Sequence, residues 1–219
     1  MATVTARIRA AEDAAGRPPG CVALLAVSKT KPIADIQAAV AAGQRAFGEN
    51  YAQEAVDKAV ALASLQLEWH FIGPVQSNKT RPLAEHMDWV HTLDREKIAR
   101  RLNEQRPATA PPLNVCLQVN ISGENSKAGL QGEEVAELAG IVSQLPNLRL
   151  RGLMAIPAPA TSVAAQRAPH QALRQLFMQL QKHYPTIDTL SMGMSGDLEA
   201  AVAEGATIVR VGTDIFGAR

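Results

Sequence analysis

Short apolar runs alternate with amphipathic segments along the whole 219-residue chain. Eight runs have the composition of strands, and several are almost continuously apolar, which is typical of parallel strands covered on both faces. These runs predict strands at residues 21–29, 45–49, 67–73, 88–93, 113–121, 149–156, 188–194 and 207–213.

Between the runs, apolar residues recur with the period of an α-helix. Residues 135–142 are apolar at positions i, i+3, i+4 and i+7, and residues 173–180 repeat that spacing. Pro32 suits the first turn of a helix that ends at Gly43. These segments predict helices that separate consecutive strands.

Capping residues and prolines indicate where helices begin and where loops lie. Asp94 and Ser195 are expected to be N-caps, because short polar side chains at such positions accept a backbone N–H bond. The proline-rich stretches 107–112 and 157–169 are expected to be loops, since the alternation continues across both.

Eight strands separated by helices predict a (β/α)8 TIM barrel of class α/β. Few residues follow the eighth predicted strand, so the helix that usually follows it has little room. Near the start of the chain, one apolar stripe is expected to form an extra N-terminal helix that covers the gap; it comprises Val4, Ile8, Ala11 and Ala15. We therefore expect a single domain spanning residues 1–219. A doubly wound sheet is the alternative, but it usually has fewer strands and a glycine-rich first turn.

Composition narrows the class of protein. Hydrophobic residues make up 47% of the chain, and 22 basic side chains face 21 acidic ones, so nothing indicates nucleic acid or an anionic membrane as partner. No apolar run is long enough to span a membrane, and charged residues stand where a signal peptide has its apolar core. Cys21 and Cys116 lie in apolar runs with the spacing of neither a zinc site nor a disulfide framework. We expect a cytoplasmic protein without a metal.

In a barrel of this kind, the functional residues lie at the C-terminal ends of the strands. Lys29 ends an otherwise apolar strand, and partial desolvation there favours a neutral amine that attacks carbonyls. Strand alternation places Lys29 on the same face as Val27, whereas Lys31 follows at a helix entry. Lys29 is therefore the predicted reactive amine; a lysine with a packed stem and a solvated head is the alternative.

The last two predicted strands carry a second signal. Ser195 lies between two nearby glycines in the motif GMSGD, and Gly212 and Thr213 follow the eighth strand. Loops at these two places often hold a phosphate group, although ordinary helix capping would use the same residues. Arg210 lies inside an apolar strand, where it needs either an internal acid or a ligand acceptor.

An amine opposite a phosphate site fits two chemistries. One is a Schiff-base aldolase that acts on sugar phosphates, and the other is pyridoxal 5′-phosphate (PLP) bound through its aldehyde. An interaction scaffold is a third possibility, but no exposed apolar stripe or charged tail supports it. The five histidines show no metal-ligand spacing and are expected to have core or surface roles; two of them, His70 and His91, fall within strands.

Seven sequence motifs, in the same order as in a known family, favour PLP binding over the aldolase and the scaffold. The chain resembles the pyridoxal phosphate homeostasis proteins, small relatives of the barrel half of alanine racemase that belong to fold type III. The motifs are LLAVSKTKP, FGENY, EWHFIGPVQSNK, QVNISGENSKAG, RGLMAI, LSMGMSGDLEAAV and VRVGTDIFGAR.

The resemblance implies a role for each matching residue. Lys29 would form the Schiff base with PLP, and Arg210 would face the pyridine nitrogen. Two residues, Asn50 and Met194, would line the pocket beside the ring, and Lys127 would be a further basic residue at the rim. The resemblance also implies that Ser195, Gly212 and Thr213 hold the phosphate.

The resemblance also implies a function. Members carry or buffer PLP, the active form of vitamin B6, with indirect effects on amino-acid pools, and they have no established turnover. It implies a monomer whose recipients are PLP-dependent apo-enzymes. The alternative is a PLP-dependent amino-acid racemase or lyase, but racemisation needs a second base on the opposite face of the substrate. Of the two tyrosines, Tyr51 follows the second predicted strand and Tyr184 ends a predicted outer helix, so neither is a convincing second base.

Overall fold

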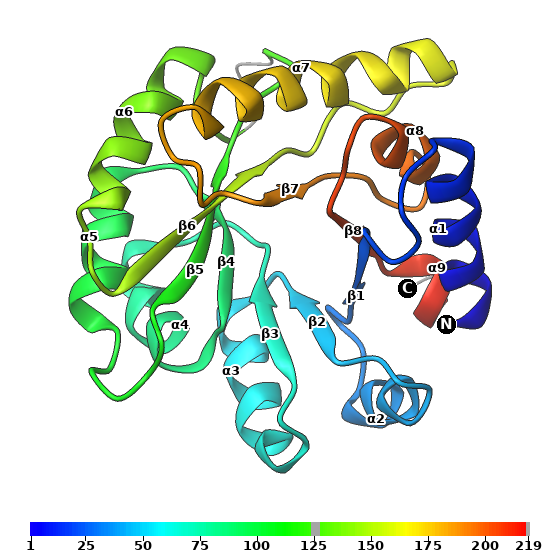
Figure 1. Cartoon of the computed structure of the whole chain (residues 1–219). Coiled ribbons are helices and arrows are strands. Elements are labelled where there is room, and N and C mark those ends of the chain that lie inside the picture. Colours follow the sequence, from blue (N-terminus) through cyan, green and yellow to red (C-terminus); the bar gives the residue numbers. More distant parts are fainter. Residues whose placement is uncertain (124–127, 218–219) are drawn as a thin grey trace.

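The eight strands form one closed parallel barrel, in which each strand pairs with the next and β8 pairs with β1 (Figure 1). The computed structural model describes residues 1–123 and 128–217. All eight strands begin and end within three residues of the predicted limits. The predicted (β/α)8 barrel is therefore confirmed.

The elements alternate in the order that the hydrophobic pattern predicts. The strands are β1 (Ala23–Val27), β2 (Ala46–Glu49), β3 (Glu68–Phe71), β4 (Trp89–Leu93), β5 (Leu113–Gln118), β6 (Leu148–Met154), β7 (Thr189–Ser191) and β8 (Ile208–Val211). The α-helices are α1 (Ala2–Ala14), α2 (Ile33–Ala41), α3 (Ala52–Ala61), α4 (Thr80–His86), α5 (Glu96–Gln105), α6 (Gly132–Ser143), α7 (Val163–Gln181), α8 (Leu198–Ala203) and α9 (Thr213–Phe216). Two 3₁₀ turns, η1 (Ala63–Leu65) and η2 (Ser77–Lys79), complete the list of described helical segments.

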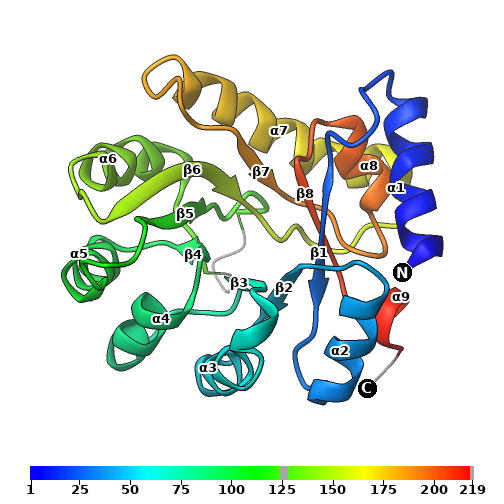
Figure 2. The same cartoon turned by 60° about the horizontal axis from the view of Figure 1, so that its bottom comes forward.

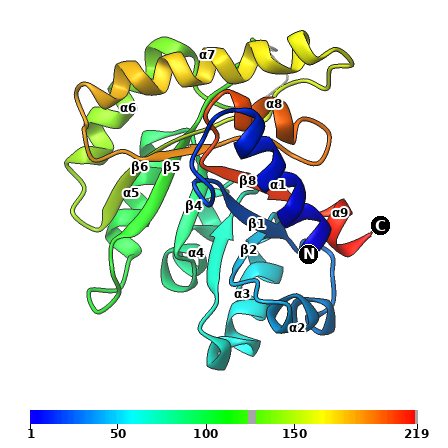
Figure 3. The ribbon, with the colours of Figure 1, turned by 45° about the vertical axis from the view of Figure 1, so that its right-hand side comes forward.

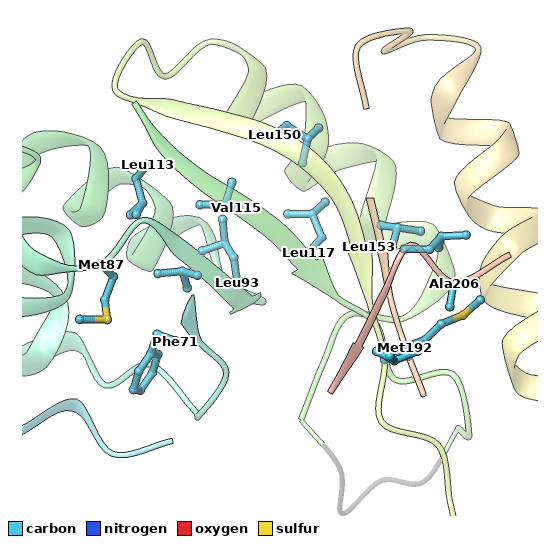
Figure 4. Packing of buried hydrophobic residues seen from close by; sticks show 14 of the residues in the cluster. Phe71, Met87, Leu93, Leu113, Val115, Leu117, Leu150, Leu153, Met192 and Ala206 are labelled. Atoms are coloured by element: carbon cyan, nitrogen blue, oxygen red, sulfur yellow. The ribbon is translucent and has the colours of Figure 1, made fainter. Parts of the chain in front are cut away.

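The main apolar core lies between the barrel and its helices. Figure 4 shows part of this layer, with Leu117, Leu153 and Met192 among the buried side chains. Among the described residues, two small apolar clusters lie apart from this layer, one around Leu25 and one around Trp89. The remaining space inside the barrel holds polar side chains, which matters for the site.

Helix α1 packs beside α8, where it covers the side of the barrel next to β1 and β8 (Figures 2 and 3). Val4, Ile8 and Ala11 are buried in this contact. Arg17, just beyond the helix, donates to the backbone oxygens of Val202 and Ala206 at 2.9 and 2.8 Å. The predicted extra N-terminal helix is confirmed, and α9 adds only one turn after β8.

Two local predictions need correction, and a third holds. Residues 157–169 are not all loop, because α7 begins at Val163, where Ser162 caps it, and Pro169 lies inside the helix. The N-cap of α5 is Arg95 rather than Asp94. The α2 limits hold: Pro32 precedes the helix, and Gly43 follows it with φ 93°, a conformation that glycine adopts without a steric cost.

The described helices include none that is both long and apolar enough to cross a membrane.

Candidate functional site

Lys29 lies in the turn that follows β1, two residues beyond Val27, and its side chain is half-buried. The backbone of this turn is fixed on both sides: Ser28 N–H donates to Gly48 O at 3.0 Å, and Lys31 N–H donates to Ser28 O at 3.0 Å. Thr30 has φ 63°, a left-handed conformation that is rare for a β-branched residue. The turn that carries Lys29 is therefore strained and held in one shape.

A buried ion pair lies directly behind this turn. Lys58 Nζ donates to Glu49 Oε1 at 2.7 Å, to Glu54 Oε1 at 2.6 Å and to the backbone oxygen of Ser28 at 2.8 Å. Ser28 Oγ donates to the same Glu49 oxygen at 2.6 Å, and Glu54 also accepts the Thr30 N–H at 2.6 Å. Glu49, Glu54 and Lys58 therefore fix the backbone on both sides of Lys29.

Burial is the main influence on the pKa of Glu49. Desolvation raises the pKa of Glu49, although the hydrogen bonds from Lys58 and Ser28 oppose that shift. Glu49 Oε2 has no hydrogen-bond partner among the described residues. From the sequence, only the position of a polar residue at the end of the second strand could be predicted, not this arrangement.

Lys31 points to the opposite side of the turn. Its Nζ donates to the backbone oxygens of Phe216 at 2.9 Å and Gly217 at 3.2 Å, which belong to the end of α9 and the residue after it. Lys31, which the sequence placed at a helix entry, thus joins the Lys29 turn to α9.

Gly212 and Thr213 lie beside the same turn. Gly212 is the N-cap of α9, and a Cβ at this position would lie 3.1 Å from the backbone oxygen of Val27. Glycine therefore allows β8 to approach the end of β1 closely. The predicted amine and the predicted phosphate-binding residues of the eighth strand lie on adjacent segments.

Ser195 lies in the loop after β7, but it is not the N-cap that the sequence predicted. That position belongs to Asp197. Asp197 Oδ1 accepts the Met194 N–H at 2.6 Å, and Oδ2 lies 3.0 Å from His170 Nε2. Burial opposes ionisation of Asp197, yet the bonds from His170 and the Met194 N–H lower its pKa. The Ser195 side chain is therefore not needed to cap α8.

One arginine joins the loop after β7 to the helix after β8. The guanidinium of Arg7, on α1, donates to the backbone oxygen of Ser195 at 2.7 Å and to Asp214 Oδ2 at 2.9 Å. It also makes two bonds to the Glu199 carboxylate, at 2.5 and 2.8 Å. A single guanidinium group thus joins the loop that carries Ser195 to the helix that begins at Thr213, a contact that the sequence analysis missed.

Arg210 is completely desolvated inside the barrel. It donates to Ser191 Oγ at 2.8 Å and to the backbone oxygen of Ala155 at 2.9 Å, both just at or beyond strand ends. Burial lowers the pKa of Arg210 to about 10, so the guanidinium keeps its charge at neutral pH. Neither partner is an acid, which leaves the alternative of a ligand acceptor open.

Asn50 and Met194 lie on opposite parts of the same rim. Asn50 follows β2, and its Oδ1 is buried without a hydrogen-bond partner in the described ranges. A Cβ at Gly73 would lie 2.0 Å from the Asn50 backbone oxygen, so glycine is required there. Met194 is 37% exposed and lines a pocket of about 240 Å³ together with Pro157 and Ala160. Lys127 lies outside the described residues.

Polar side chains continue from Arg210 toward the N-terminal mouth of the barrel. Ser191 Oγ lies 2.8 Å from His91 Nδ1, and His91 Nε2 lies 2.9 Å from His70 Nδ1. His70 Nε2 in turn lies 3.5 Å from Glu68 Oε1. The sequence placed both histidines in strands but did not reveal that their rings meet.

A pocket of about 340 Å³ opens at that N-terminal mouth. Its lining includes Cys21, Glu68, His70, Trp89 and Arg151. Most of these polar groups bind one another: Trp89 Nε1 donates to Glu68 Oε1 at 2.5 Å, and the Arg151 guanidinium lies 4.5 Å from the Trp89 ring centroid. No group of three or more potential metal ligands occurs in the part of the chain that the structure describes.

Comparison with known proteins agrees with this geometry. The family model for the alanine racemase N-terminal domain matches residues 1–219. The chain is 64% identical to the pyridoxal phosphate homeostasis protein of Pseudomonas aeruginosa, covering 100% of this chain and 94% of that protein. It is 58% identical to the protein of the same name from Escherichia coli, covering 100% of this chain and 95% of that protein. The chain belongs to the pyridoxal phosphate homeostasis protein family.

A solved structure supports the same family assignment. PipY of Synechococcus elongatus, determined with PLP bound, is 40% identical and superposes with a TM-score of 0.84 over 96% of this chain and 100% of PipY. The residues present here fit such a group: the buried Arg210 donates to a hydroxyl and a backbone oxygen, and the Asn50 and Glu49 side chains carry buried oxygens with no hydrogen-bond partner among the described residues. The family resemblance read from the sequence motifs is confirmed.

Proposed function

We propose that this chain binds PLP through a Schiff base with Lys29 and serves as a carrier or buffer in vitamin B6 homeostasis. The strained turn at the end of β1 carries the proposal, because the Glu49–Lys58 ion pair and Lys31 fix the backbone on both sides of Lys29. PLP supplies an aldehyde carbon. The Lys29 amine forms a C=N bond to that carbon, and the carbonyl oxygen leaves as water.

Ser195, Gly212 and Thr213 are proposed to hold the phosphate. They lie in the loops after the seventh and eighth strands, where (β/α)8 barrels often bind phosphate. Arg7 supports this role without being a proposed ligand, since it bonds to the Ser195 backbone oxygen and to Asp214, the neighbour of Thr213.

Arg210 is proposed to donate an N–H to the pyridine nitrogen. An arginine keeps its proton at neutral pH, so it would leave that nitrogen unprotonated and the ring a poorer acceptor of electrons. Asn50 and Met194 are proposed to lie beside the ring, one at each side of the rim. This combination favours holding PLP over activating an amino acid.

Reversible capture suits a carrier. An imine exchanges with other amines, so PLP-dependent apo-enzymes are the proposed recipients in the cytoplasm, and the proposed working unit is a monomer. Tyr51, the tyrosine nearer to the rim in sequence, is 52% exposed. Tyr184 packs against the outer core. Neither position supports a second catalytic base.

Borohydride reduction of the PLP-loaded protein tests the proposal. We expect visible absorbance before reduction, a stable adduct afterwards, and mass spectrometry that maps the adduct to Lys29. Lys29→Ala should lose the absorbance, whereas Lys31→Ala should keep it. Mapping of the label to Lys31, or absence of a label, would overturn the assignment.

The phosphate residues and the lack of turnover have tests of their own. Ser195→Ala and Thr213→Val should each weaken PLP binding without loss of the Lys29 adduct at saturating PLP. Unchanged affinity in both variants would remove the phosphate assignment. Racemisation or elimination of a panel of amino acids at enzyme-like rates would replace the carrier function by the enzyme alternative.

A further inference from the structure

Four side chains connect the buried arginine to the opposite mouth of the barrel. The contacts run from Arg210 to Ser191 Oγ at 2.8 Å, from Ser191 to His91 Nδ1 at 2.8 Å, and from His91 Nε2 to His70 Nδ1 at 2.9 Å. Glu68 Oε1 lies 3.5 Å from the remaining His70 nitrogen, Nε2. Ser191 and His91 are fully buried, and His70 is 3% exposed. We call the three residues Ser191, His91 and His70 the interior relay.

The two end groups, Arg210 and Glu68, determine which atom of each contact carries the proton. Arginine can only donate, so Ser191 Oγ accepts from Arg210. The Ser191 hydroxyl proton is then available to His91 Nδ1. A neutral imidazole that accepts at Nδ1 carries its proton at Nε2, so His91 donates to His70 Nδ1. By the same reasoning, His70 carries its proton at Nε2, facing the Glu68 carboxylate.

The contact between His70 and Glu68 disfavours the opposite direction of these hydrogen bonds. If His91 donated from Nδ1 to Ser191, its Nε2 would have to accept from His70 Nδ1–H. Neutral His70 would then present an unprotonated Nε2 to the Glu68 carboxylate, and two acceptors would face each other. With both rings neutral, one direction therefore gives each of the three hydrogen bonds a donor and an acceptor, and every donor points away from Arg210.

The surroundings keep the middle of the relay neutral. Burial is the main reason why the pKa of His91 lies well below its usual value, and electrostatic interactions with His70 and Arg210 lower this pKa further. From the other strands, Cys116 lies in the apolar cluster beside Trp89, and burial raises its thiol pKa to about 12, so it adds no charge. Arg151 is paired with Asp188 at 2.7 Å, at the N-terminal mouth.

We propose that Ser191, His91 and His70 are positioning residues, which hold the Arg210 guanidinium toward the ligand through one directional hydrogen-bond relay. The relay ends at His70, whose Nε2 lies 3.5 Å from Glu68 Oε1. The link to a ligand rests on the proposed function. The direction of the relay rests on the side chains alone. The inference thus adds a supporting layer beneath the proposed PLP site, reaching the face of the barrel opposite Lys29.

The first test needs no PLP. In protein labelled with ¹⁵N-histidine, long-range proton–nitrogen correlation spectra at neutral pH report which ring nitrogen carries the proton. We expect His91 and His70 both as neutral Nε2–H tautomers, with the signals assigned by loss in His91→Gln and His70→Gln. A proton on Nδ1 of either ring, or a doubly protonated ring, would overturn the relay.

The second test asks whether the relay acts on the ligand. Ser191→Ala removes the link between Arg210 and His91, and we expect PLP affinity to fall about ten-fold, as for one buried hydrogen bond left unmade. The absorbance band of bound PLP should shift as well. Thr189→Val is the matched control: it removes a buried hydroxyl from the same strand, but that hydroxyl bonds to Asp188 Oδ1 at 2.8 Å and lies outside the relay.

The outcomes separate the two proposals. Equal effects of Ser191→Ala and Thr189→Val, or wild-type affinity and band position in Ser191→Ala, would overturn the positioning role. If the wild-type chain instead fails to form a Lys29 adduct, the proposed function falls. In that case the tautomers in the unliganded protein still decide whether the directional relay exists.

Discussion

Arg7 and Asp214, 207 residues apart in the sequence, form an ion pair at 2.9 Å. The pair joins the extra helix α1 to the one-turn helix α9. Because the same guanidinium also donates to the Ser195 backbone oxygen, α1 takes part in shaping the proposed phosphate site.

Replacement of Arg7 should therefore affect ligand binding more than stability. In Arg7→Gln, the loss in free energy of unfolding should be at most about 1 kcal/mol, as is usual for partly exposed ion pairs. PLP affinity should fall several-fold because the two phosphate-binding loops lose their common contact. Equilibrium urea unfolding and PLP titration measure the two effects.

The control for Arg7 is another exposed arginine pair. Arg100 donates to Glu96 at 2.7 Å on α5, away from the predicted phosphate loops. Arg100→Gln should leave PLP affinity unchanged. An Arg7→Gln variant that binds PLP like Arg100→Gln would remove the role of α1 in the site.

The ion pair behind the Lys29 turn predicts an asymmetric response. Lys58→Met leaves Glu49 buried without its cation, which typically costs about 3–5 kcal/mol. Glu49→Gln should cost only about 1–2 kcal/mol, since Lys58 keeps Glu54 and the Ser28 backbone oxygen as partners. Urea unfolding of both variants measures the difference. Equal losses would show that Glu54 does not compensate.

The contacts of Glu12 lead us to expect a free energy of unfolding that depends on pH. Burial opposes its ionisation, but bonds from Arg9 and from the backbone of Gly20 and Val22 lower its pKa from 4.5 to about 2. A carboxylate with a lowered pKa in the folded state stabilises the protein above its unfolded pKa, and this contribution is lost as pH falls toward the folded value. Glu12→Gln should thus destabilise the protein at pH 7 and have little effect near pH 2.

This prediction is tested by the urea midpoints of Glu12→Gln and of the wild type, measured between pH 2 and pH 7. Asp13→Asn, an exposed change at the next position of α1, is the matched control and should track the wild type at every pH. A Glu12→Gln deficit that is constant with pH would indicate lost packing instead of lost ionic bonding.

Gly73 allows the Asn50 backbone to lie against the third strand. A methyl group there would meet the Asn50 backbone oxygen at 2.0 Å, so Gly73→Ala must displace the loop after β2. We expect a loss of about 1–3 kcal/mol in stability, the usual cost of overpacking, together with weaker PLP binding. Thermal unfolding and PLP titration test both expectations.

Gly132 provides the comparison for Gly73. It begins α6, and a Cβ at this position would meet no atom within 4 Å. Gly132→Ala should be neutral or slightly stabilising, because alanine has the higher helix propensity. If Gly73→Ala behaves in the same way, the close contact with Asn50 is not a constraint.

Much of the fold was predictable because parallel barrel strands leave a strong pattern. Most strand positions are buried, and several strands read as apolar runs, so the count of eight indicated the barrel. The rule that parallel barrel strands end at one mouth allowed Lys29, Gly212 and Thr213 to be placed at the rim without coordinates; their roles toward a ligand stay predictions. The stripe at Val4 and Ile8 predicted the covering role of α1.

The errors arose where two residues could fill one role. Ser195 and Asp197 both suit an N-cap, and the backbone register that selects Asp197 is not visible in the sequence. At α5 the helix begins one residue later than Asp94 predicted, and the observed N-cap, Arg95, makes no capping bond with its side chain. Pro169 was read as a loop residue, yet α7 is long enough to tolerate one missing hydrogen bond.

The contacts that organise the site were beyond sequence reasoning. The partners of Arg7 lie 188 to 207 residues away, and the residues of the interior relay come from three different strands. A single sequence shows that these polar side chains are present but not which of them meet after the barrel closes. Their positions follow from the strand register, which only the folded structure fixes.

The position of α1 also has a consequence for the order of folding. This helix is made before the barrel, yet it rests on α8, and its Arg7 bonds to groups that follow it by 192 and 207 residues. Contacts between such distant segments carry a large loop-closure entropy and form slowly. We expect α1 to remain undocked during synthesis until α8 and β8 emerge, so that the nascent barrel stays open along the β1–β8 seam until those elements have left the ribosome.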